Sequence, residues 1–281
     1  MTTHTLPIAL LQMRSGTDAA ENVAAVRAGV REAAAAGARL VATPEMTVCL
    51  DRRPGALLAQ AHAQAQDPSV RALCDIAREA GVDLLVGSLA VRVGPQHLAN
   101  RSLLIDAAGQ IVAHYDKIHL FDVDLGPGER YQESARFVPG DRAVLAAREG
   151  YTLGLSICYD LRFAGLYRTL AQAGAQVLTI PSAFTVPTGR AHWEVLLRAR
   201  AIETGCYVLA PAQHGVHADG RETYGHSMVI DPWGQIVAVR AQEPGLLLAT
   251  LDLDAVAQAR RRLPSLQHDR AYAQPPHVTG G

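Results

Sequence analysis

The sequence predicts an α/β protein in which two mixed β-sheets pack face to face and carry helices on both outer sides, a four-layer α-β-β-α sandwich. Three features lead to this prediction. Strands and amphipathic helices alternate through residues 7–91, antiparallel hairpins follow, and the second half of the chain has a similar rhythm. Because the strands are almost continuously apolar, the sheets need cover on both faces, and so large a set of strands can divide into two packed sheets.

The first part of the chain predicts three strands that alternate with two helices. The strands are expected at residues 7–13, 38–43 and 82–91, and the helices at residues 18–37 and 68–80. Ala, Val, Arg and Glu recur at helical spacing in the first helix, and Gly37 and Gly81 are suited to the helix ends. The resulting order is β-α-β-α-β.

Antiparallel pairing is expected after this unit. Residues 101–106 and 110–115 form one predicted hairpin, and residues 143–148 and 151–157 form another across Glu149-Gly150. A helix is expected from Gly165 onward, a strand at 176–180 and a helix at 191–204. The remaining predicted strands are residues 206–212, 227–230, 236–239 and 246–251.

Length and composition indicate one domain over residues 1–281, because no internal segment resembles a linker. The tail at residues 267–281 has little apolar periodicity, so we expect it to lie on the surface or to cross to a partner subunit. With 26 Lys plus Arg against 27 Asp plus Glu, the net charge of −1 gives no field that would recruit nucleic acid or an anionic membrane. A small or neutral partner is therefore expected.

The location expected from the sequence is the cytoplasm. The first residues lack a charged segment followed by an apolar one, and no apolar run approaches the length of a membrane span. The four cysteines occur singly, which argues against both a disulfide framework and a zinc ribbon and favours a reducing compartment. We interpret Cys49, Cys74 and Cys206 as structural thiols.

Cys158 is the candidate nucleophile. Apolar residues alternate through residues 151–157, the cysteine stands where this strand stops, and a predicted helix follows. The positive end of a helix dipole would favour the thiolate form. A buried cysteine that acts only as a small apolar residue is the alternative, but the polar Tyr159, Asp160 and Arg162 that follow favour catalysis.

Two further charged residues stand at strand ends. Glu45 follows the apolar run 40–42 through Thr43-Pro44, and Lys117 follows the strand that ends at Tyr115. Sites of α/β proteins collect at the carboxyl ends of strands. Each residue alone could be a surface charge at a turn, but together with Cys158 they supply a base for a thiol and a cation for an attacked carbonyl oxygen.

A metal site is not expected. None of the 11 histidines stands in a context that marks it as the base or as a ligand. His214 and His217 lie in one short segment, yet a pair without a third ligand nearby is typical of a solvated loop.

Longer motifs surround the three candidate residues. They are Pro44-Glu45-Met46, residues 115–122 (YDKIHLFD) and residues 158–163 (CYDLRF), with further blocks at 181–184, 191–203, 224–227 and 231–234. In this order they resemble the signature blocks of the nitrilase superfamily of carbon–nitrogen hydrolases. The resemblance runs from about residue 7 to residue 268, which is nearly the whole chain.

Within that superfamily, residues 131–134 (YQES) and the helix at 191–203 are most similar to the branch of deaminated glutathione amidase and omega-amidase. The ending at residues 263–268 is closer to the first of these. The segment 123–130 departs from the shorter loop of the branch, which leaves the local shape of the pocket mouth open.

The resemblance implies a mechanism without a metal or an organic cofactor. Glu45 would be the general base, Lys117 the cation that stabilises the oxyanion together with the Tyr159 N–H, and Cys158 the nucleophile that forms a thioester. Glu133 matches a second glutamate that orients Lys117 and the substrate. Its alternative interpretation is a surface charge on a loop.

Three residues are expected at the substrate. Arg162 matches a position associated with a substrate carboxylate, which a guanidinium suits, but it could instead cap a turn or pair with Asp160. Phe184 and Thr188 would line the same pocket mouth, or serve as a packing aromatic and a helix N-cap.

The activity that the resemblance implies is hydrolysis of deaminated glutathione to 2-oxoglutarate and cysteinylglycine. An omega-amidase acting on 2-oxoglutaramate or 2-oxosuccinamate, a nitrile or N-carbamoyl hydrolase, and a noncatalytic scaffold are the alternatives. In this family the helix at 191–203 lies at a subunit contact, so a homodimer or higher homo-oligomer is expected. As an isolated pattern it is an ordinary amphipathic helix with Glu194 and Arg198 as an i,i+4 pair.

Overall fold

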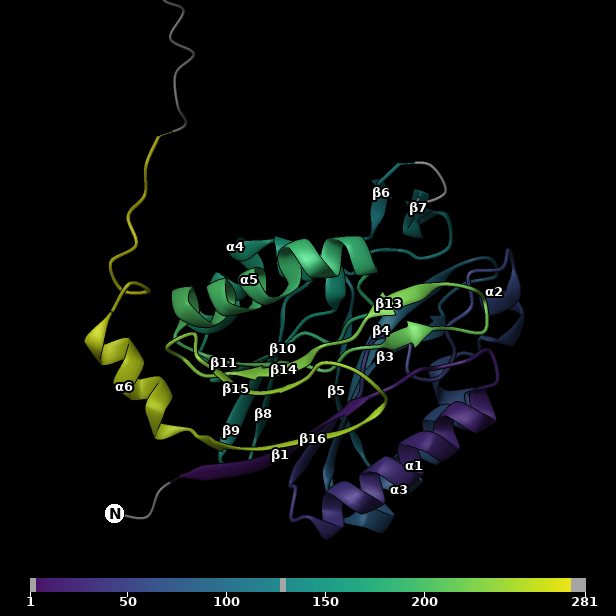
Figure 1. Cartoon of the computed structure of the whole chain (residues 1–281), viewed down its shortest axis with the longest axis horizontal. Helices are drawn as coiled ribbons and strands as arrows, with labels where there is room; N and C mark the ends of the chain where they lie inside the picture. The colour runs from purple at the N-terminus through teal and green to yellow at the C-terminus, as the bar shows by residue number, and fades with distance from the viewer. Residues whose placement is uncertain (1–3, 127–129, 274–281) are drawn as a thin grey trace, which may run out of the picture.

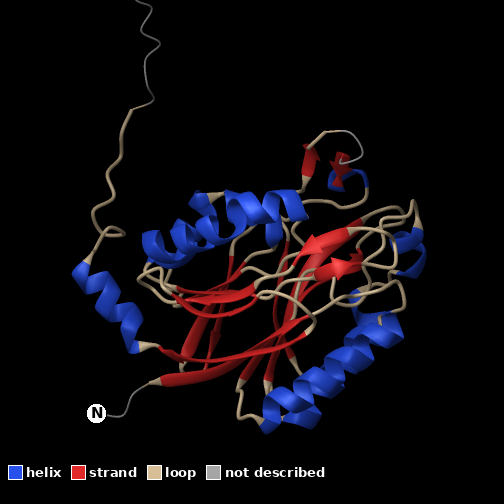
Figure 2. Cartoon of the chain, viewed as in Figure 1, coloured by secondary structure: helices blue, strands red, loops and turns tan. Residues whose placement is uncertain are grey.

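The computed structural model describes residues 4–126 and 130–273. Figure 1 shows two stacked β-sheets with a pair of helices on each outer side. The helices α1 (Ala19–Ala35) and α3 (Pro68–Ala80) cover one sheet, and α4 (Ala164–Gln172) and α5 (Val186–Thr204) cover the other. The same layering in Figure 2 confirms the predicted α-β-β-α sandwich.

The first sheet has the strand order β16-β1-β2-β3-β4-β5. Its strands are β1 (Thr5–Gln12), β2 (Leu40–Ala42), β3 (Asp83–Arg92), β4 (Leu98–Ile105), β5 (Ile111–Asp116) and β16 (Gly245–Asp252). β1, β2 and β3 are parallel, which confirms the predicted β-α-β-α-β unit, and β4 with β5 forms the predicted hairpin. β16 returns from the far end of the chain and pairs with β1 in antiparallel orientation.

The second sheet has the order β15-β14-β11-β10-β9-β8. Its strands are β8 (Val144–Arg148), β9 (Tyr151–Leu155), β10 (Val177–Thr179), β11 (Tyr207–Ala210), β14 (Ser227–Ile230) and β15 (Ile236–Arg240). β9, β10 and β11 are parallel and their outer neighbours are antiparallel, so both sheets are mixed, as predicted.

Local chemistry explains where the two helices of the first unit begin. The Asp18 side chain accepts hydrogen bonds from the N–H groups of Ala20 (2.8 Å) and Glu21 (3.1 Å) at the start of α1. Asp67 accepts from the Ser69 N–H (2.8 Å) at the start of α3. These side chains satisfy N–H groups that have no partner within the helix, so each helix begins at its capping aspartate.

The residues of strand β1 are apolar on both faces of the strand because each face packs against another layer. Ile8 and Leu10 belong to the core between the two sheets, whereas Ala9 and Leu11 pack under α1 and α3. All four are buried, because alternate side chains of a central strand face opposite layers.

Several short or polar elements have no counterpart in the sequence-based prediction. They are α2 (Ala56–Gln60), α6 (Asp254–Arg262), the hairpins β6 (Asp122–Asp124) with β7 (Arg130–Gln132) and β12 (His214–Val216) with β13 (Glu222–Tyr224), and the 3₁₀ turns η1 (Gln64–Gln66), η2 (Glu133–Ala135) and η3 (Cys158–Arg162). α6 is rich in arginine and only its Val256 and Ala259 are buried, so it lacks the apolar content that marks the other helices.

Helix α5 begins five residues before the predicted start. Pro187 lies in its first turn, where the missing proline N–H has no intrahelical partner to lose. None of the helices within the described residues combines the length and the apolar character that a bilayer crossing requires.

The segment after α6 is described only as far as residue 273. In Figure 1 it leads away from the sandwich. Its last firm attachment is Asp269, which pairs with Arg168 of α4 at 2.7 Å, and residues 267–273 are exposed. The remaining part of the expected tail, residues 274–281, lies outside the described residues.

Gly87 allows the turn that follows β2 to lie against β3. It is buried at an irregularity in the pairing of β3 with β4, and its N–H donates to Thr43 Oγ1 at 3.0 Å. A Cβ atom at this position would overlap the carbonyl oxygens of Thr43 and Pro44 and would press on Pro181 of the second sheet. The backbone that leads to Glu45 therefore depends on a residue without a side chain.

Gly87→Ala is expected to lower the free energy of unfolding by about 1–3 kcal/mol, because the turn after β2 and the Pro181 ring must move away from β3. Urea denaturation measures the change. Gly165→Ala is the matched control: its Cβ would meet no atom within 4 Å on α4, so no loss is expected there. Equal stability of the Gly87 variant and the control would show that the close approach is not required.

Candidate active site

The structure brings Glu45, Lys117 and Cys158 together in one cavity of about 260 Å³. Glu45 follows β2, Lys117 follows β5 directly, and Cys158 follows β9, so the first two come from one sheet and the third from the other. All three side chains are buried, with exposed fractions of 5%, 2% and 8%. The convergence expected at the strand ends is thus present in the structure.

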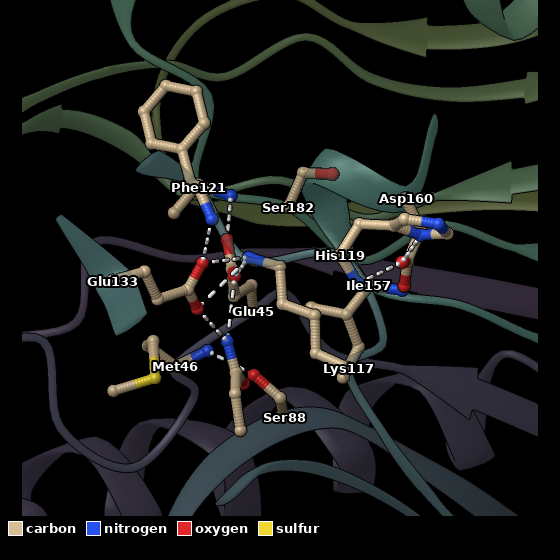
Figure 3. A network of polar contacts seen from close by, with 12 residues as sticks. Glu45, Met46, Ser88, Lys117, His119, Phe121, Glu133, Ile157, Asp160 and Ser182 are labelled. Atoms are coloured by element: carbon tan, nitrogen blue, oxygen red, sulfur yellow. Dashed lines mark hydrogen bonds and ion pairs between the residues drawn. The ribbon is translucent and has the colours of Figure 1, made fainter. Parts of the chain in front are cut away.

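Lys117 lies between two carboxylates (Figure 3). Its Nζ atom is 2.8 Å from Glu45 Oε1 and 2.9 Å from Glu133 Oε2. Glu133 is therefore part of the buried network, and its interpretation as a loop surface charge is wrong. An ammonium has three N–H donors, and Glu133 Oε1, at 3.2 Å, is a third acceptor, so the two carboxylates surround the Lys117 ammonium.

Other donors hold the two carboxylates in place. Asn100 Nδ2 donates to Glu45 Oε1 and to Glu133 Oε1, both at 3.0 Å. The Ala183 N–H donates to Glu45 Oε2 at 3.0 Å, and the Phe121 N–H donates to Glu133 Oε2 at 2.7 Å. Figure 3 shows the Phe121 N–H beside the Glu133 carboxylate. The positions of both carboxylates are thus determined by groups from both sheets.

Glu45 and Lys117 both stay charged within this network. Burial alone would raise the pKa of Glu45, but the Lys117 ammonium, with a further contribution from Arg221, holds this pKa below its ordinary value. Burial alone would lower the pKa of Lys117, but the Glu133 and Glu45 carboxylates raise it well above its ordinary value. Near neutral pH the site thus contains a carboxylate base beside a protonated amine.

Cys158 occupies a strained position at the start of η3. Its φ of 48° is in the left-handed region, which residues other than glycine rarely adopt, and its N–H donates to Pro181 O at 2.9 Å. Cys158 and Glu45 line the same cavity, and the carboxylate charge of Glu45 acts on the thiol. The backbone conformation thus places the sulfur in the cavity that also holds its candidate base.

The thiol is not activated in the way that the sequence suggested. Burial, and next the negative charge of Glu45, raise the pKa of Cys158 far above its ordinary value, and the opposing effect of Lys117 is smaller. The expectation that a helix end favours the thiolate is therefore wrong, because η3 is a five-residue turn and the tertiary surroundings dominate. The free site holds a neutral thiol that needs a base.

Asp160 ties the Lys117 segment to the Cys158 turn. Its Oδ2 atom accepts from Tyr115 Oη (2.7 Å) and from the Ile157 N–H (2.9 Å), and its Oδ1 atom accepts from the His119 N–H (3.1 Å). Figure 3 shows this second cluster beside the first. Asp160 is fully buried, so the relative position of the two strand ends depends on it.

The expected substrate residues line the cavity. Arg162 lies over the rings of Tyr159 (5.8 Å) and Phe184 (5.5 Å), and its Nη1 atom contacts His192 Nδ1 at 3.3 Å. The alternative of a pair with Asp160 is wrong, since the Asp160 oxygens are bound elsewhere. Within the described chain, no carbonyl accepts from the Tyr159 N–H, which leaves this donor for a ligand.

Phe184 has both expected functions, whereas Thr188 has only one of them. Phe184 packs against Trp193 with ring centroids 4.8 Å apart and also lines the cavity. Thr188 lines the cavity too, but Thr185 is the N-cap of α5, and the two hydroxyls are 2.8 Å apart. The N-cap interpretation of Thr188 is therefore wrong by one turn.

Sequence reasoning missed Asn100 and Arg221. Asn100 lies inside β4, where a polar residue in a buried run is a signal of a site. Arg221 lies before β13 and lines the cavity, but nothing in its local sequence distinguishes it from a surface arginine.

One histidine of the pair His214 and His217 is held by hydrogen bonds to other parts of the protein. His217 is buried, and its ring nitrogens contact Ser15 O (2.9 Å) and Thr223 Oγ1 (2.7 Å). Among residues 4–126 and 130–273, no group of three His, Cys, Asp or Glu side chains gathers as metal ligands would.

The segment 123–130, which departs from the shorter loop of the branch, lies in the hairpin of β6 and β7, and residues 127–129 lie outside the described chain.

Comparison with known proteins gives consistent matches. The family model for carbon–nitrogen hydrolases matches residues 7–261. The chain is 38% identical over 268 residues to deaminated glutathione amidase of Yersinia enterocolitica, covering 94% of this chain and 92% of the relative. It is 43% identical over 274 residues to deaminated glutathione amidase of Homo sapiens, covering 94% of this chain and 82% of the relative.

A solved structure adds chemical information. A glutamate-to-glutamine variant of the amidase from Nesterenkonia sp. AN1 has a TM-score of 0.78 and 31% identity to this chain, covering 92% of this chain and 95% of that one. It carries the acetamide moiety of fluoroacetamide covalently on its active-site cysteine. That amidase is described as a member of the nitrilase superfamily.

Glu45→Gln is expected to lower the pKa of the Cys158 thiol by about one to three pH units, because the carboxylate charge disappears while the Lys117 ammonium stays. Thiolate absorbance at 240 nm measures the titration, with the corresponding Cys158→Ala protein subtracted in each background. The unaltered protein should show no Cys158 titration below pH 9. A midpoint below pH 8 in that protein, or an unchanged midpoint in the variant, would contradict the assigned electrostatics.

Proposed function

The chain belongs to the carbon–nitrogen hydrolase family, and from that premise we propose that it is an amidase that hydrolyses deaminated glutathione to 2-oxoglutarate and cysteinylglycine. Relatives at about 40% identity over most of the chain carry this activity in their names and support the choice of substrate. The observation that carries the proposal is the neutral Cys158 thiol that shares a cavity with an ionised Glu45, which is paired with Lys117.

The first half of the reaction forms a thioester. Glu45 removes the thiol proton as the sulfur attacks the amide carbon, so no free thiolate needs to accumulate. The Lys117 ammonium and the Tyr159 N–H hold the oxyanion of the tetrahedral intermediate. The carbon–nitrogen bond then breaks, and Glu45 returns the proton to the departing amine of cysteinylglycine.

The second half releases the acid. Glu45 takes a proton from a water molecule that attacks the thioester carbon, and the same two donors stabilise the second oxyanion. When the carbon–sulfur bond breaks, the sulfur recovers the proton from Glu45, and 2-oxoglutarate leaves. Glu133 acts through Lys117, whose position it determines, and is a positioning residue in this scheme.

The proposal also includes the oligomeric state of the enzyme and its location in the cell. A homodimer or higher homo-oligomer is supported by Val195 and Ile202, which are exposed on one face of α5. A cytoplasmic location is supported by the four cysteines, which are all free thiols, the state that a reducing compartment maintains.

The substrate proposal is tested by comparing kcat/KM for deaminated glutathione and for 2-oxoglutaramate, which share the oxo-acid acyl group and differ in the amine. We expect a preference of at least about tenfold for deaminated glutathione, because only this compound fills the amine side of the cavity. A preference for 2-oxoglutaramate would overturn the substrate assignment and leave the hydrolytic mechanism in place.

We expect kcat/KM to fall by at least about 10³-fold in each of three variants, Cys158→Ala, Glu45→Gln and Lys117→Met. They remove the nucleophile, the base and the oxyanion cation, respectively. Lys117→Met also leaves two buried carboxylates unpaired and should lose about 3–5 kcal/mol of stability, so its assay belongs well below its melting temperature. Cys74→Ala, a partly exposed thiol outside the cavity, is the control that should retain activity. A residue whose variant keeps most of the activity would be removed from the mechanism.

A further inference from the structure

A row of three aromatic rings forms one wall of the cavity. Tyr131 and Phe121 have ring centroids 5.2 Å apart, and Phe121 and Tyr159 have centroids 5.0 Å apart. All three residues line the cavity, and they come from β7, from the loop after β5 and from η3. The row gives the wall a direction, with Tyr131 at one end and Tyr159 at the other.

A guanidinium group stands at each end of this row. Arg221 Cζ lies 5.8 Å from the centroid of the Tyr131 ring, and Arg162 Cζ lies 5.8 Å from that of the Tyr159 ring. Within the described chain, neither arginine forms an ion pair with a carboxylate. Two cations held over the ends of an aromatic wall suit a ligand with a negative charge at each end.

Arg221 has donors that the protein does not use. Its Nη2 atom donates to Ala183 O, while its Nε atom is buried and has no partner among the described residues. A buried donor without a partner is costly, and a ligand oxygen would remove that cost. Arg200 shows the contrast, because its Nε and Nη1 atoms bond to Leu161 O and to Glu203.

The loop that carries Arg221 is held in position before any ligand binds. The His217 N–H donates to Arg221 O at 2.8 Å, and Asp219 Oδ1 accepts from the Arg221 N–H at 2.9 Å. The buried ring of His217 anchors the loop to Ser15 and to Thr223. The guanidinium is thus presented by a closed hairpin, which reduces the entropy that is lost on binding.

We propose that Arg221 binds the carboxylate at the amine end of the substrate, the glycine carboxylate of deaminated glutathione, and thereby selects this substrate over a simple amide. Arg162 then faces the oxo-acid carboxylate at the acyl end. The inference rests on the proposed function and assigns a specificity residue to the leaving side of the same site.

The direction of the substrate follows from Glu45. In the mechanism this residue protonates the leaving amine, so the amine side of the substrate lies toward Glu45. Arg221 is the arginine whose charge acts on Glu45, and both residues contact Ala183, through its carbonyl and its N–H respectively. The leaving peptide therefore extends from Glu45 toward Arg221.

The test uses three compounds: deaminated glutathione, its analogue with the glycine carboxylate converted to a carboxamide, and 2-oxoglutaramate. The unaltered enzyme should prefer the free acid over the carboxamide by about 10- to 100-fold in kcat/KM, the value of a charge-assisted contact. In Arg221→Gln this ratio should fall to about one. Because the ratio compares two substrates with the same scissile bond, any effect of the variant on the Glu45 pKa cancels.

Two variants serve as controls, and melting temperatures confirm that each protein folds. Arg130→Gln removes the same charge from an exposed arginine that also lines the cavity, and it should leave the ratio unchanged within about twofold. Arg221→Lys keeps the charge without the planar fork and should retain part of the preference.

The outcomes separate this inference from the proposed function. If the unaltered enzyme prefers deaminated glutathione and Arg221→Gln keeps the ratio of free acid to carboxamide, the assignment of Arg221 is wrong and the function stands. An equal loss of the ratio in Arg130→Gln would show a diffuse charge effect and would also overturn the assignment. If the unaltered enzyme prefers 2-oxoglutaramate, the proposed function and this inference fail together.

Discussion

The Lys117 ammonium, buried between Glu45 and Glu133, is the interaction on which the rest of the site depends. Taking these charges out of water is costly, so each must find partners inside the protein. The oxygens of both carboxylates receive hydrogen bonds from Lys117, from Asn100 and from backbone N–H groups. The same network sets the protonation states, because it keeps Glu45 ionised, and burial together with the Glu45 charge keeps the neighbouring thiol neutral. The proposed base and the proposed nucleophile therefore differ in pKa in the direction that general base catalysis requires.

The sandwich makes this arrangement possible by bringing strand ends of two sheets to one place. Lys117 and Glu45 belong to the first sheet and Cys158 to the second, so their geometry depends on how the sheets are joined. Asp160 joins them through hydrogen bonds to Tyr115 and to the Ile157 N–H. Gly87 of β3 lets the turn before Glu45 and Pro181 approach closely, where a side chain would overlap both. The contacts that stabilise the protein at this edge also position the residues of the site. Small changes in packing there would therefore displace the reacting atoms.

The fold class and the three central residues could be predicted because their signals are local. Apolar alternation and helix-ending glycines mark the elements, and a charged residue or a cysteine near the end of a buried strand marks each part of the site. Features that arise only from tertiary contacts could not be predicted in this way. The Cys158 pKa is set by burial and by Glu45, 113 positions earlier in the numbering (158 minus 45), and the sequence-based expectation for it was wrong. Asn100 and Arg221 are placed at the cavity only by contacts with neighbours that are distant along the chain.

The central claim is that Cys158 carries the acyl group while Glu45 moves the protons. Intact-protein and peptide mass spectrometry of acid-quenched mixtures with deaminated glutathione tests this claim most directly, because the bond in question is covalent. The account predicts a 2-oxoglutaryl group on the peptide that contains Cys158, with an adduct that persists in Glu45→Gln, where hydrolysis of the thioester lacks its base. Turnover by Cys158→Ala, or an acyl group attached to a different residue, would contradict the account.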